Sequence, residues 1–328
     1  MSVRFFIVGR AEAGRPVGAC LSARLSLSRA AVRRLLAAQQ VRVNGKPCLD
    51  PNWRLQRGQR VQVRLSDAPQ KRDKTSPARL PHGPRPTIRY ADKHLVVVDK
   101  PAGLTTMRHA EEAAEFGSRG KRFLPPTLAD LLPDLLARRS PQERTPVRAV
   151  HRLDKETSGL VVFARTVEAE RHLGRQFRAH TIERQYLAVV RGRAKNARIE
   201  SWLVRDRGDG RRGSAPTPGE GQRAVTHVRV LEELGDYTLV ECRLETGRTH
   251  QVRIHLGEAG TPLCGERLYD RPLHGKPLPD DSGMKRVALH AALLGFEHPV
   301  TGEAMRWTST LTRDMNDLVK RLRSRPPA

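Results

Sequence analysis

One acidic residue of this chain, Asp154, has neighbours that suit covalent chemistry. Arg152 and Lys155 flank it, and the run 160–164 that follows shortly after is apolar throughout and predicts a buried strand. A carboxylate on a polar loop at a strand edge, close to cations, can be held ionised and act as a nucleophile. An isolated Asp beside an Arg is more often a solvated surface residue, so this interpretation depends on the rest of the chain.

Three further stretches accompany the Asp154 loop, HRLDKETSGL at 151–160, in a recognisable order and spacing. They are VVVDKPAGLTT at 96–106, ERQYLAVVRG at 183–192 and ETGRTHQVRIHL at 245–256. Together the four stretches resemble the RluA-type RNA pseudouridine synthases, and the resemblance covers residues 88–315. It implies one active site that contains Asp154, Tyr186 and Arg253.

The chain departs from the family pattern in two places. In GERLYD, residues 265–270, Glu266 stands where the family has Asp, and Asp270 stands where Gly is expected. Residues 104–108 lack the usual His-Pro. We expect these positions to shape RNA contacts rather than chemistry.

The reaction implied by the resemblance explains why such residues are needed. Uridine becomes pseudouridine when the base–ribose bond breaks, the base turns, and carbon 5 is joined to the ribose. No atoms are gained or lost, so we expect no cofactor and no metal. A carboxylate can assist by attacking either the uracil ring or the anomeric carbon of the ribose, and the sequence leaves both routes open.

A carboxylate covered by a base needs a cation beside it. Burial raises the pKa of a carboxyl by up to ~3–5, and a neighbouring Arg opposes this by ~1–3. Arg253 is the expected partner, on a helix over 249–260 with Thr249 as its cap and Gly260 as its terminator; Arg248 in the preceding loop is the alternative. Tyr186 opens a strand, and the resemblance implies that its ring stacks on the flipped uracil.

We expect other residues near the site to contact the substrate. They are His151, Arg152, Thr157, Arg248, His250 and Gln251. A planar guanidinium such as that of Arg152 could fill the gap left by a flipped base. Thr157, Ser158 and Gly159 are expected to fix the loop by side-chain-to-backbone hydrogen bonds.

The first fifth of the chain is strongly basic. Residues 1–66 hold 13 Lys and Arg against 2 Asp and Glu, within a total net charge of +25, which points to a nucleic acid partner. A helix opening at Ser28, with Ala31, Leu35 and Ala38 on one face, is followed by strands around an Asn44-Gly45 turn and over 61–65. This pattern resembles the small RNA-binding domain of a ribosomal small-subunit protein and of tyrosyl-tRNA synthetases, although the helix around 18–24 lacks the expected basic-acidic pair.

Several side chains of this module are expected to bind RNA. They are Arg29, Arg33, Arg34, Arg42, Asn44 and Lys46.

The chain divides into three parts: a small basic RNA-binding domain over 1–66, a proline-rich linker over 67–87, and a catalytic domain over 88–328. Strand patterns with interspersed helices after residue 88 predict an α+β domain on a mixed or antiparallel central sheet. The resemblance identifies it with the pseudouridine synthase fold, preceded by a small α/β domain.

Other features exclude several classes of protein. No apolar run approaches the ~20 residues of a membrane span, and the N-terminus has no signal-peptide pattern. Four scattered cysteines, without C-x-x-C spacing, predict neither a zinc site nor disulfides. His250 and His255 are five residues apart and do not share a helix face, so no metal site is expected. We expect a cytoplasmic protein, by default a monomer.

The resulting hypothesis is an isomerase, an RNA pseudouridine synthase that acts on specific uridines in structured RNA. Ribosomal RNA is the expected substrate because of the appended domain. The alternatives are a synthase directed at tRNA, and a non-catalytic RNA-binding or ribosome-assembly protein that retains the fold. A nucleic-acid hydrolase would want metal ligands, which the sequence does not offer.

Overall fold

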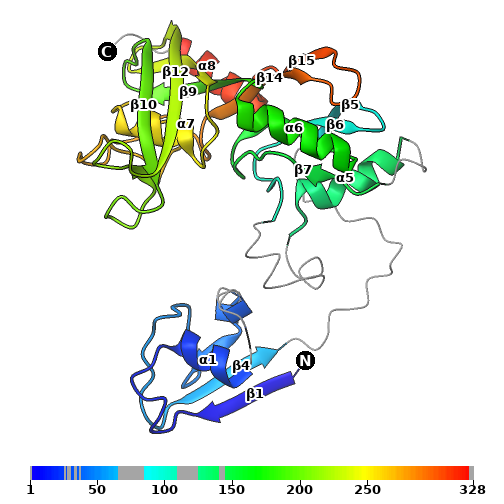
Figure 1. The fold of residues 1–328 in the computed structure, drawn as a ribbon. Coiled ribbons are helices and arrows are strands. Elements are labelled where there is room, and N and C mark those ends of the chain that lie inside the picture. The colour runs from blue at the N-terminus through cyan, green and yellow to red at the C-terminus, as the bar shows by residue number, and fades with distance from the viewer. Residues whose placement is uncertain are drawn as a thin grey trace. The chain divides into compact units, whose positions relative to one another are not determined.

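The computed structural model describes residues 2–25, 27, 31–32, 35–36, 38–65, 85–108, 125–139 and 145–324. The chain forms two compact units, Met1–Ser76 and Pro77–Ala328, and each is described by itself (Figure 1). Most of the proposed linker, 67–87, lies outside the described residues, as do residues 109–124.

The N-terminal unit is built on a sheet with the strand order β1-β4-β2-β3, in which all neighbours are antiparallel. Its elements are β1 (Ser2–Ile7), α1 (Val17–Leu25), β2 (Val41–Val43), β3 (Lys46–Pro47) and β4 (Arg60–Leu65). Asn44 and Gly45, with φ of 48° and 80°, form the predicted turn between β2 and β3. The strand β1 was not predicted.

Two details of this unit differ from the sequence prediction. The uncertain helix around 18–24 is present as α1, because Val17, Cys20 and Leu21 bury one face against the sheet. In the described part of the second helical segment, Val32 and Leu36 are buried and Leu35 packs against the same core. Of the predicted face, Ala31 and Leu35 are half-buried and Ala38 is exposed, so burial is centred on the neighbouring positions 32 and 36. The expected cap at residue 28 lies outside the described residues.

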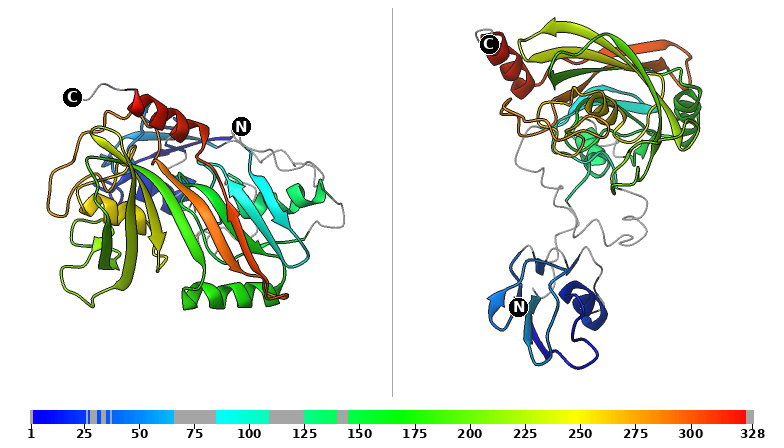
Figure 2. Two further views of the ribbon diagram at one scale, coloured as in Figure 1. Left: turned by 90° about the horizontal axis from the view of Figure 1, so that it is seen from above. Right: turned by 90° about the vertical axis from the view of Figure 1, so that its left-hand side faces the viewer.

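The C-terminal unit is built on a larger sheet, seen in two further orientations in Figure 2. Its strands are β5 (Thr87–Ala91), β6 (Leu95–Lys100), β7 (Arg148–Ala149), β8 (Ser158–Ala164), β9 (Glu183–Arg191), β10 (Ala197–Val204), β11 (Gly213–Ser214), β12 (Gln222–Glu233), β13 (Tyr237–Leu244), β14 (Leu289–Glu297) and β15 (Ala304–Thr308). Its helices are α5 (Leu128–Ala137), α6 (Val167–Ala179), α7 (Gln251–Glu258) and α8 (Arg313–Arg323).

The strand order is β11-β10-β12-β13-β9-β14-β8-β6-β5, with β15 paired to β14 and β7 to β8. The pairing of β14 with β8 is parallel and the other pairings are antiparallel, so the sheet is mixed. The predicted α+β class is confirmed.

Helices cover both faces of this sheet. Successive strand residues point to opposite sides, and in the central strands both sets are apolar and pack against helices. In β6, Val96 and Val98 pack with α5, whereas Leu95 and Val97 pack with α6. Further along the sheet, α7 shares a core with the even-numbered residues of β9, and α8 with Val189 on the other face. Thus α5 and α7 cover one face, and α6 and α8 cover the other.

Most strongly patterned elements lie where the sequence predicted them. Thr166 is the N-cap of α6 and accepts a hydrogen bond from the backbone of Ala169. Antiparallel hairpins are formed by β12 with β13 and by β14 with β15, and α8 follows the second of them.

Candidate active site

The register of three strands brings the Asp154 turn and Tyr186 to one place. β14 lies between β8 and β9, and Ala291 of β14 is paired with Gly159 on one side and with Tyr186 on the other. Gly159 has a φ of 112°, and a Cβ there would overlap the carbonyl oxygen of Ala291. Only glycine permits this approach, so the loop that carries Asp154 enters β8 close to Tyr186.

The turn after Asp154 is fixed through its backbone. The amide of Thr157 donates to the carbonyl oxygen of Asp154 at 3.1 Å. Beneath the turn, the buried ammonium of Lys100 donates to the carbonyl oxygens of Leu104 at 2.8 Å and Lys155 at 3.2 Å. Burial lowers the pKa of Lys100 to about 7, although the charge of Asp154 opposes this. The Lys100 ammonium therefore binds the backbone of this turn, and the Asp154 side chain lines the pocket.

A second cation holds the same turn from the C-terminal side. Arg286 donates from Nη1 to the carbonyl oxygen of Glu156 at 3.2 Å. Its other nitrogens bind Asp314, at the start of α8, at 2.6 and 2.9 Å, and the hydroxyl of Thr312 at 2.7 Å. The turn after Asp154 is thus tied to the last helix.

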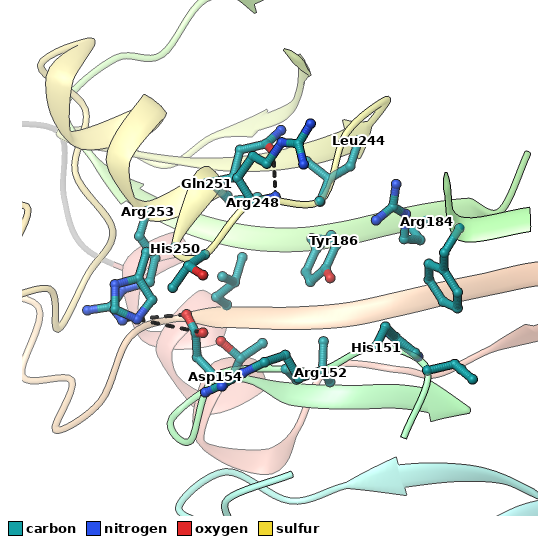
Figure 3. A pocket seen from close by; sticks show the side chains of 18 of the residues that line it. His151, Arg152, Asp154, Arg184, Tyr186, Leu244, Arg248, His250, Gln251 and Arg253 are labelled. Carbon is teal, nitrogen blue, oxygen red and sulfur yellow. Dashed lines mark hydrogen bonds and ion pairs between the residues drawn. The ribbon is translucent and has the colours of Figure 1, made fainter. Parts of the chain in front are cut away.

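Two basic side chains of the α7 region face the Asp154 carboxylate (Figure 3). Nη1 of Arg253 is 3.5 Å from Oδ2 of Asp154, and Nε2 of His250 is 3.7 Å from Oδ1. Arg253 also makes a two-pronged contact with Glu266, from Nε at 2.7 Å and from Nη2 at 2.9 Å. Arg253 therefore bridges two carboxylates, and the closer one is Glu266.

Glu266 is a buried anchor rather than an RNA contact, which corrects our expectation for this position. Its side chain has no exposed surface, and Oε1 also accepts from the backbone amides of residues 267, 268 and 269. Burial raises the pKa of Glu266, but the hydrogen bonds and charge of Arg253, together with the backbone amides of residues 268 and 269, outweigh burial and lower the pKa. Burial likewise lowers the pKa of Arg253, but the hydrogen bonds and charge of Glu266, together with the charge of Asp154, outweigh burial and raise the pKa.

The carboxylate of Asp154 borders a cavity of about 560 Å³ that is also lined by Tyr186, Arg184 and the loop before α7. Burial raises the pKa of Tyr186 to about 12, with a smaller contribution of the same sign from the charge of Asp154, while Arg184 opposes it. Tyr186 thus presents a protonated phenol near the nucleophile candidate at neutral pH. Polar groups that converge in a pocket of this size are typical of a binding site.

His151 and Arg152 both line the cavity, but their surroundings differ. Nε2 of His151 accepts a hydrogen bond from the amide of Val162 at 3.0 Å. The His151 ring stacks on the Phe177 ring, with the two ring centres 4.5 Å apart. Burial lowers the pKa of His151 to about 3, so the ring is a neutral part of the wall. Arg152 is exposed at the rim, where it can reach a ligand.

The residues after Asp154 do not fix the loop in the way that we predicted. Ser158 places its hydroxyl 2.9 Å from Nδ1 of His290, a side-chain contact between β8 and β14. The hydroxyl of Thr157 is buried and, among the described residues, has no hydrogen-bond partner. Thr157 lines the cavity, but its hydroxyl is shielded from solvent.

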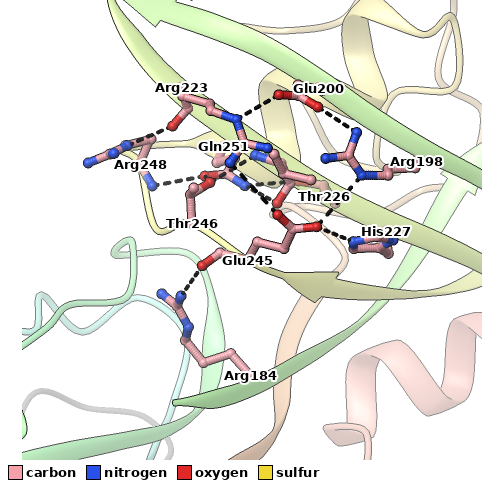
Figure 4. Close-up of polar contacts among 11 residues, drawn as sticks. Arg184, Arg198, Glu200, Arg223, Thr226, His227, Glu245, Thr246, Arg248 and Gln251 are labelled. Atoms are coloured by element: carbon pink, nitrogen blue, oxygen red, sulfur yellow. Dashed lines mark hydrogen bonds and ion pairs between the residues drawn. The ribbon is translucent and has the colours of Figure 1, made fainter. Parts of the chain in front are cut away.

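Gln251 was predicted to contact the substrate, and its hydrogen bonds contradict this. Its amide nitrogen donates to the carbonyl oxygen of Val225 and the hydroxyl of Thr226, at 2.9 and 3.0 Å. Its oxygen accepts from the Thr246 hydroxyl at 2.8 Å and from the Arg248 amide at 3.0 Å (Figure 4). With all four positions occupied, Gln251 shapes the loop that precedes α7.

The start of α7 also differs from the prediction. His250, not Thr249, is the N-cap, in a left-handed conformation with φ of 60°, and no side chain caps the helix. Gly260, with φ of 82°, follows the helix end as predicted. Nε of Arg248 donates to the carbonyl oxygen of Arg223 at 3.0 Å. The helix start therefore directs His250 and Arg253 toward Asp154, and no contact of Arg248 with Asp154 is found.

Sequence reasoning missed three residues of this site: Glu266, Tyr269 and Arg184. The hydroxyl of Tyr269 is 2.8 Å from Nδ1 of His250, and the Arg253 guanidinium lies 5.3 Å from the centre of its ring. Arg184 donates to the carbonyl oxygen of Glu245 at 3.2 Å. The GERLYD stretch was the available signal for the first two, since it holds a carboxylate and a phenol three residues apart.

The predicted RNA-binding residues of the N-terminal unit are only partly described. Arg29, Arg33 and Arg34 lie outside the described side chains. Lys46 is exposed, whereas Oδ1 of Asn44 accepts a hydrogen bond from the amide of Arg60 at 2.8 Å. The Asn44 side chain thus ties its turn to the start of β4, and its predicted contact with RNA is not supported by this geometry.

Within the described parts of the chain, no cluster of three His, Cys, Asp or Glu side chains could hold a metal ion. The four cysteines are buried and form no disulfide. Among the helices that the structure describes, none is long and apolar enough to cross a membrane.

Comparisons with known proteins agree with this geometry. Residues 94–258 match the family described as RNA pseudouridylate synthase, and residues 19–61 match the S4 domain. The chain is 38% identical over 251 residues to ribosomal large subunit pseudouridine synthase D of Nitrosomonas europaea, covering 73% of this chain and 66% of that protein. It is 35% identical over 304 residues to an uncharacterized RNA pseudouridine synthase of Bacillus subtilis, covering 90% of each.

The fold is also found in a solved structure, that of human RNA pseudouridylate synthase domain containing 4. The two share a TM-score of 0.57 and 24% sequence identity, over 74% of this chain and 94% of the human one. This likeness supports the fold of the C-terminal unit.

Proposed function

Because this chain belongs to the RNA pseudouridylate synthase family, and is therefore an isomerase acting on uridine in RNA, we propose that Asp154 is its nucleophile. Tyr186 and Arg253 complete the proposed active site, and ribosomal RNA is the proposed substrate. The observation that carries the proposal is the placement of one carboxylate at a polar cavity between Arg253 and Tyr186.

The reaction breaks the bond between N1 of uracil and C1′ of ribose and forms the bond between C5 and C1′. The C5 proton is lost, and N1 gains one, so the atoms balance without a co-reactant. Asp154 forms a transient bond either to the uracil ring or to C1′, and both routes remain compatible with the geometry. Arg253, whose charge is secured by Glu266, attracts the Asp154 carboxylate and directs it into the cavity.

Tyr186 has two roles in this proposal. Its ring forms the surface on which the flipped uracil lies. Its phenol gives its proton to N1 of the detached base, and the resulting phenolate then takes the proton from C5, which restores the phenol. The Asp154 charge contributes to the high pKa of Tyr186. Once Asp154 forms a neutral ester, that contribution disappears and the phenol becomes a stronger acid, so its phenolate becomes easier to form late in the reaction.

The substrate proposal follows from the relatives. The Nitrosomonas europaea protein is named for the large ribosomal subunit, and this chain carries the S4 domain match in front of its catalytic unit. A ribosomal RNA substrate is therefore preferred over tRNA.

The nucleophile is tested by tritium release from C5 of labelled uridine in RNA. Asp154→Asn is expected to abolish release while RNA affinity stays within about 2-fold of the wild type. The matched control is Asp317→Asn on α8, a half-exposed carboxylate whose ion pair spans 3.7 Å, which is expected to leave release unchanged. Retained turnover in Asp154→Asn would overturn the assignment of the nucleophile.

The substrate is tested separately, by mapping pseudouridine in ribosomal and transfer RNA from cells that lack the protein. A ribosomal site that disappears, and returns with the wild type but not with Asp154→Asn, is the expected result. A site lost from tRNA instead would overturn the substrate proposal and leave the chemistry intact.

A further inference from the structure

The N-terminal sheet has an outer face that lies only partly within the S4 match, because β1 precedes residue 19 and the end of β4 follows residue 61. In the pairing of β1 with β4, Phe5 is opposite Gln62 and Ile7 is opposite Arg60; in the pairing of β4 with β2, Gln62 is opposite Arg42. Paired residues share a face, so these side chains lie together. We call this surface the outer sheet face; its members are Phe5, Ile7, Arg42, Arg60, Gln62 and Arg64.

The opposite face of the same strands forms the core. Val41, Val43, Val61 and Val63 are buried there with residues of α1. On the outer sheet face, by contrast, Phe5 is 52% exposed and Ile7 is 66% exposed. An apolar pair of this kind on an edge strand invites association unless a ligand or partner uses it.

The same face is positively charged. Arg60 and Arg64 are exposed, Arg42 is half-buried, and the Arg60 guanidinium lies 4.8 Å from the centre of the Phe5 ring. The two carboxylates of residues 1–66 lie on loops: Glu12 pairs with Arg24, and Asp50 accepts from the amide of residue 52. The described part of the outer sheet face therefore has three cations and no acidic group.

We propose that the outer sheet face binds single-stranded RNA, with a base stacked on Phe5 and phosphates held by Arg42, Arg60 and Arg64. An exposed aromatic ring among guanidinium groups is the combination that binds unpaired nucleotides, because every base has a flat face and every linkage a negative charge. A duplex hides its bases from such a ring. A second copy of this chain would set the same three guanidinium groups against their equivalents.

This binding site goes beyond the proposed function, because that function needs only the catalytic unit. The inference rests on the proposed function in one respect, that RNA is the ligand. The site would add to the RNA contacts that we predicted for Arg29, Arg33 and Arg34.

The test measures binding of full-length protein to a labelled ten-nucleotide oligocytidine, which offers no uridine to the active site. Phe5→Ala is expected to weaken binding about 5- to 100-fold, the range seen when one stacking ring is removed. Phe5→Trp, which retains a flat ring, is expected to bind like the wild type. Leu49→Ala, at a loop residue that is 57% exposed, is the control and is expected to have no effect.

Charge is tested by a second pair of variants. Arg60→Gln and Arg64→Gln are each expected to reduce the slope of log affinity against log salt by about 0.7. Duplex RNA of the same length is expected to be insensitive to Phe5→Ala.

Unchanged affinity in Phe5→Ala together with unchanged slopes would overturn the proposal. The proposal would also be overturned if light scattering showed a dimer for the wild type and a monomer for Phe5→Ala while RNA affinity stayed the same. The outer sheet face would then be a contact between two copies of the chain. Tritium release is measured on the same samples: release by the wild type that depends on Asp154, with no effect of Phe5→Ala on binding, would reject this site alone.

Discussion

Arg253 binds the buried carboxylate of Glu266 through two hydrogen bonds of 2.7 and 2.9 Å, and reaches Asp154 only at 3.5 Å. Glu266 therefore fixes the position of the Arg253 guanidinium in the absence of substrate. The position of the Asp154 carboxylate depends in turn on that guanidinium, so the buried Glu266 influences the geometry of the proposed nucleophile without contacting it.

The first prediction concerns Glu266→Gln. One oxygen must still accept from the amides of residues 267–269, which turns the new NH₂ group toward Arg253, and two donors then face each other. We expect kcat to fall about 10- to 100-fold, about 1.4 to 2.7 kcal/mol in the barrier, with KM little changed. Single-turnover tritium release measures this.

Two variants make that prediction specific. Glu266→Asp keeps the charge and is expected to recover most of the rate, because the family pattern has Asp at this position. Glu183→Gln removes an exposed partner of Arg306 and is expected to leave kcat unchanged. An unaltered rate in Glu266→Gln would show that Arg253 does not need this anchor.

The second prediction concerns Arg286→Lys. Arg286 is largely buried and joins the carbonyl of Glu156, in the turn after Asp154, to Asp314 and Thr312. A lysine cannot make this fork, so we expect a loss of about 1 to 3 kcal/mol in unfolding free energy and a lower kcat. Urea unfolding and tritium release measure the two effects.

Arg306→Lys is the matched control, because its pair with Glu183 is exposed on both sides and such pairs contribute less than about 1 kcal/mol. If Arg286→Lys lost stability without losing rate, the link to α8 would be structural only. If neither changed, the link would have no role.

Much of the catalytic unit could be predicted because its signals are local. The strands β6, β8 and β9 each contain a continuous apolar run, and Asp154 lies in the short polar turn that leads into β8. The position of β14 could not be predicted, since a parallel pairing with β8 depends on contacts between segments 132 residues apart, such as Ser158 with His290.

The network behind the catalytic residues was likewise beyond local patterns. Gln251 and Glu266 look like surface residues in the sequence, yet both are buried and engaged. The role of each depends on partners from another part of the chain, Val225 for Gln251 and Arg253 for Glu266. The start of α7 at His250 has no capping side chain, so the usual helix signals pointed to Thr249.

The last prediction is a pH dependence of stability that comes from His255. This ring is 1% exposed, and burial lowers its pKa to about 4; its nitrogens lie 2.9 and 3.0 Å from the hydroxyls of Thr226 and Ser201. Between pH 6.5 and 4 the unfolded chain binds a proton at this residue and the folded chain does not. Stability is therefore complete above pH 6.5 and falls as the pH is lowered, by up to about 3 kcal/mol from this one residue.

Urea unfolding at pH 7.0 and pH 5.0 measures the loss of unfolding free energy on acidification. The loss is compared between variants, because other buried histidines contribute in the same direction. In His255→Gln, which cannot titrate, we expect the loss on acidification to be about 2 kcal/mol smaller than in the wild type. His274→Asn replaces an exposed histidine at φ 61°, a conformation that Asn tolerates. This control is expected to lose as much unfolding free energy between pH 7.0 and pH 5.0 as the wild type. Equal losses in all three proteins would mean that His255 titrates normally in the fold, and that the hydroxyls around it accept its charged form as readily as water does.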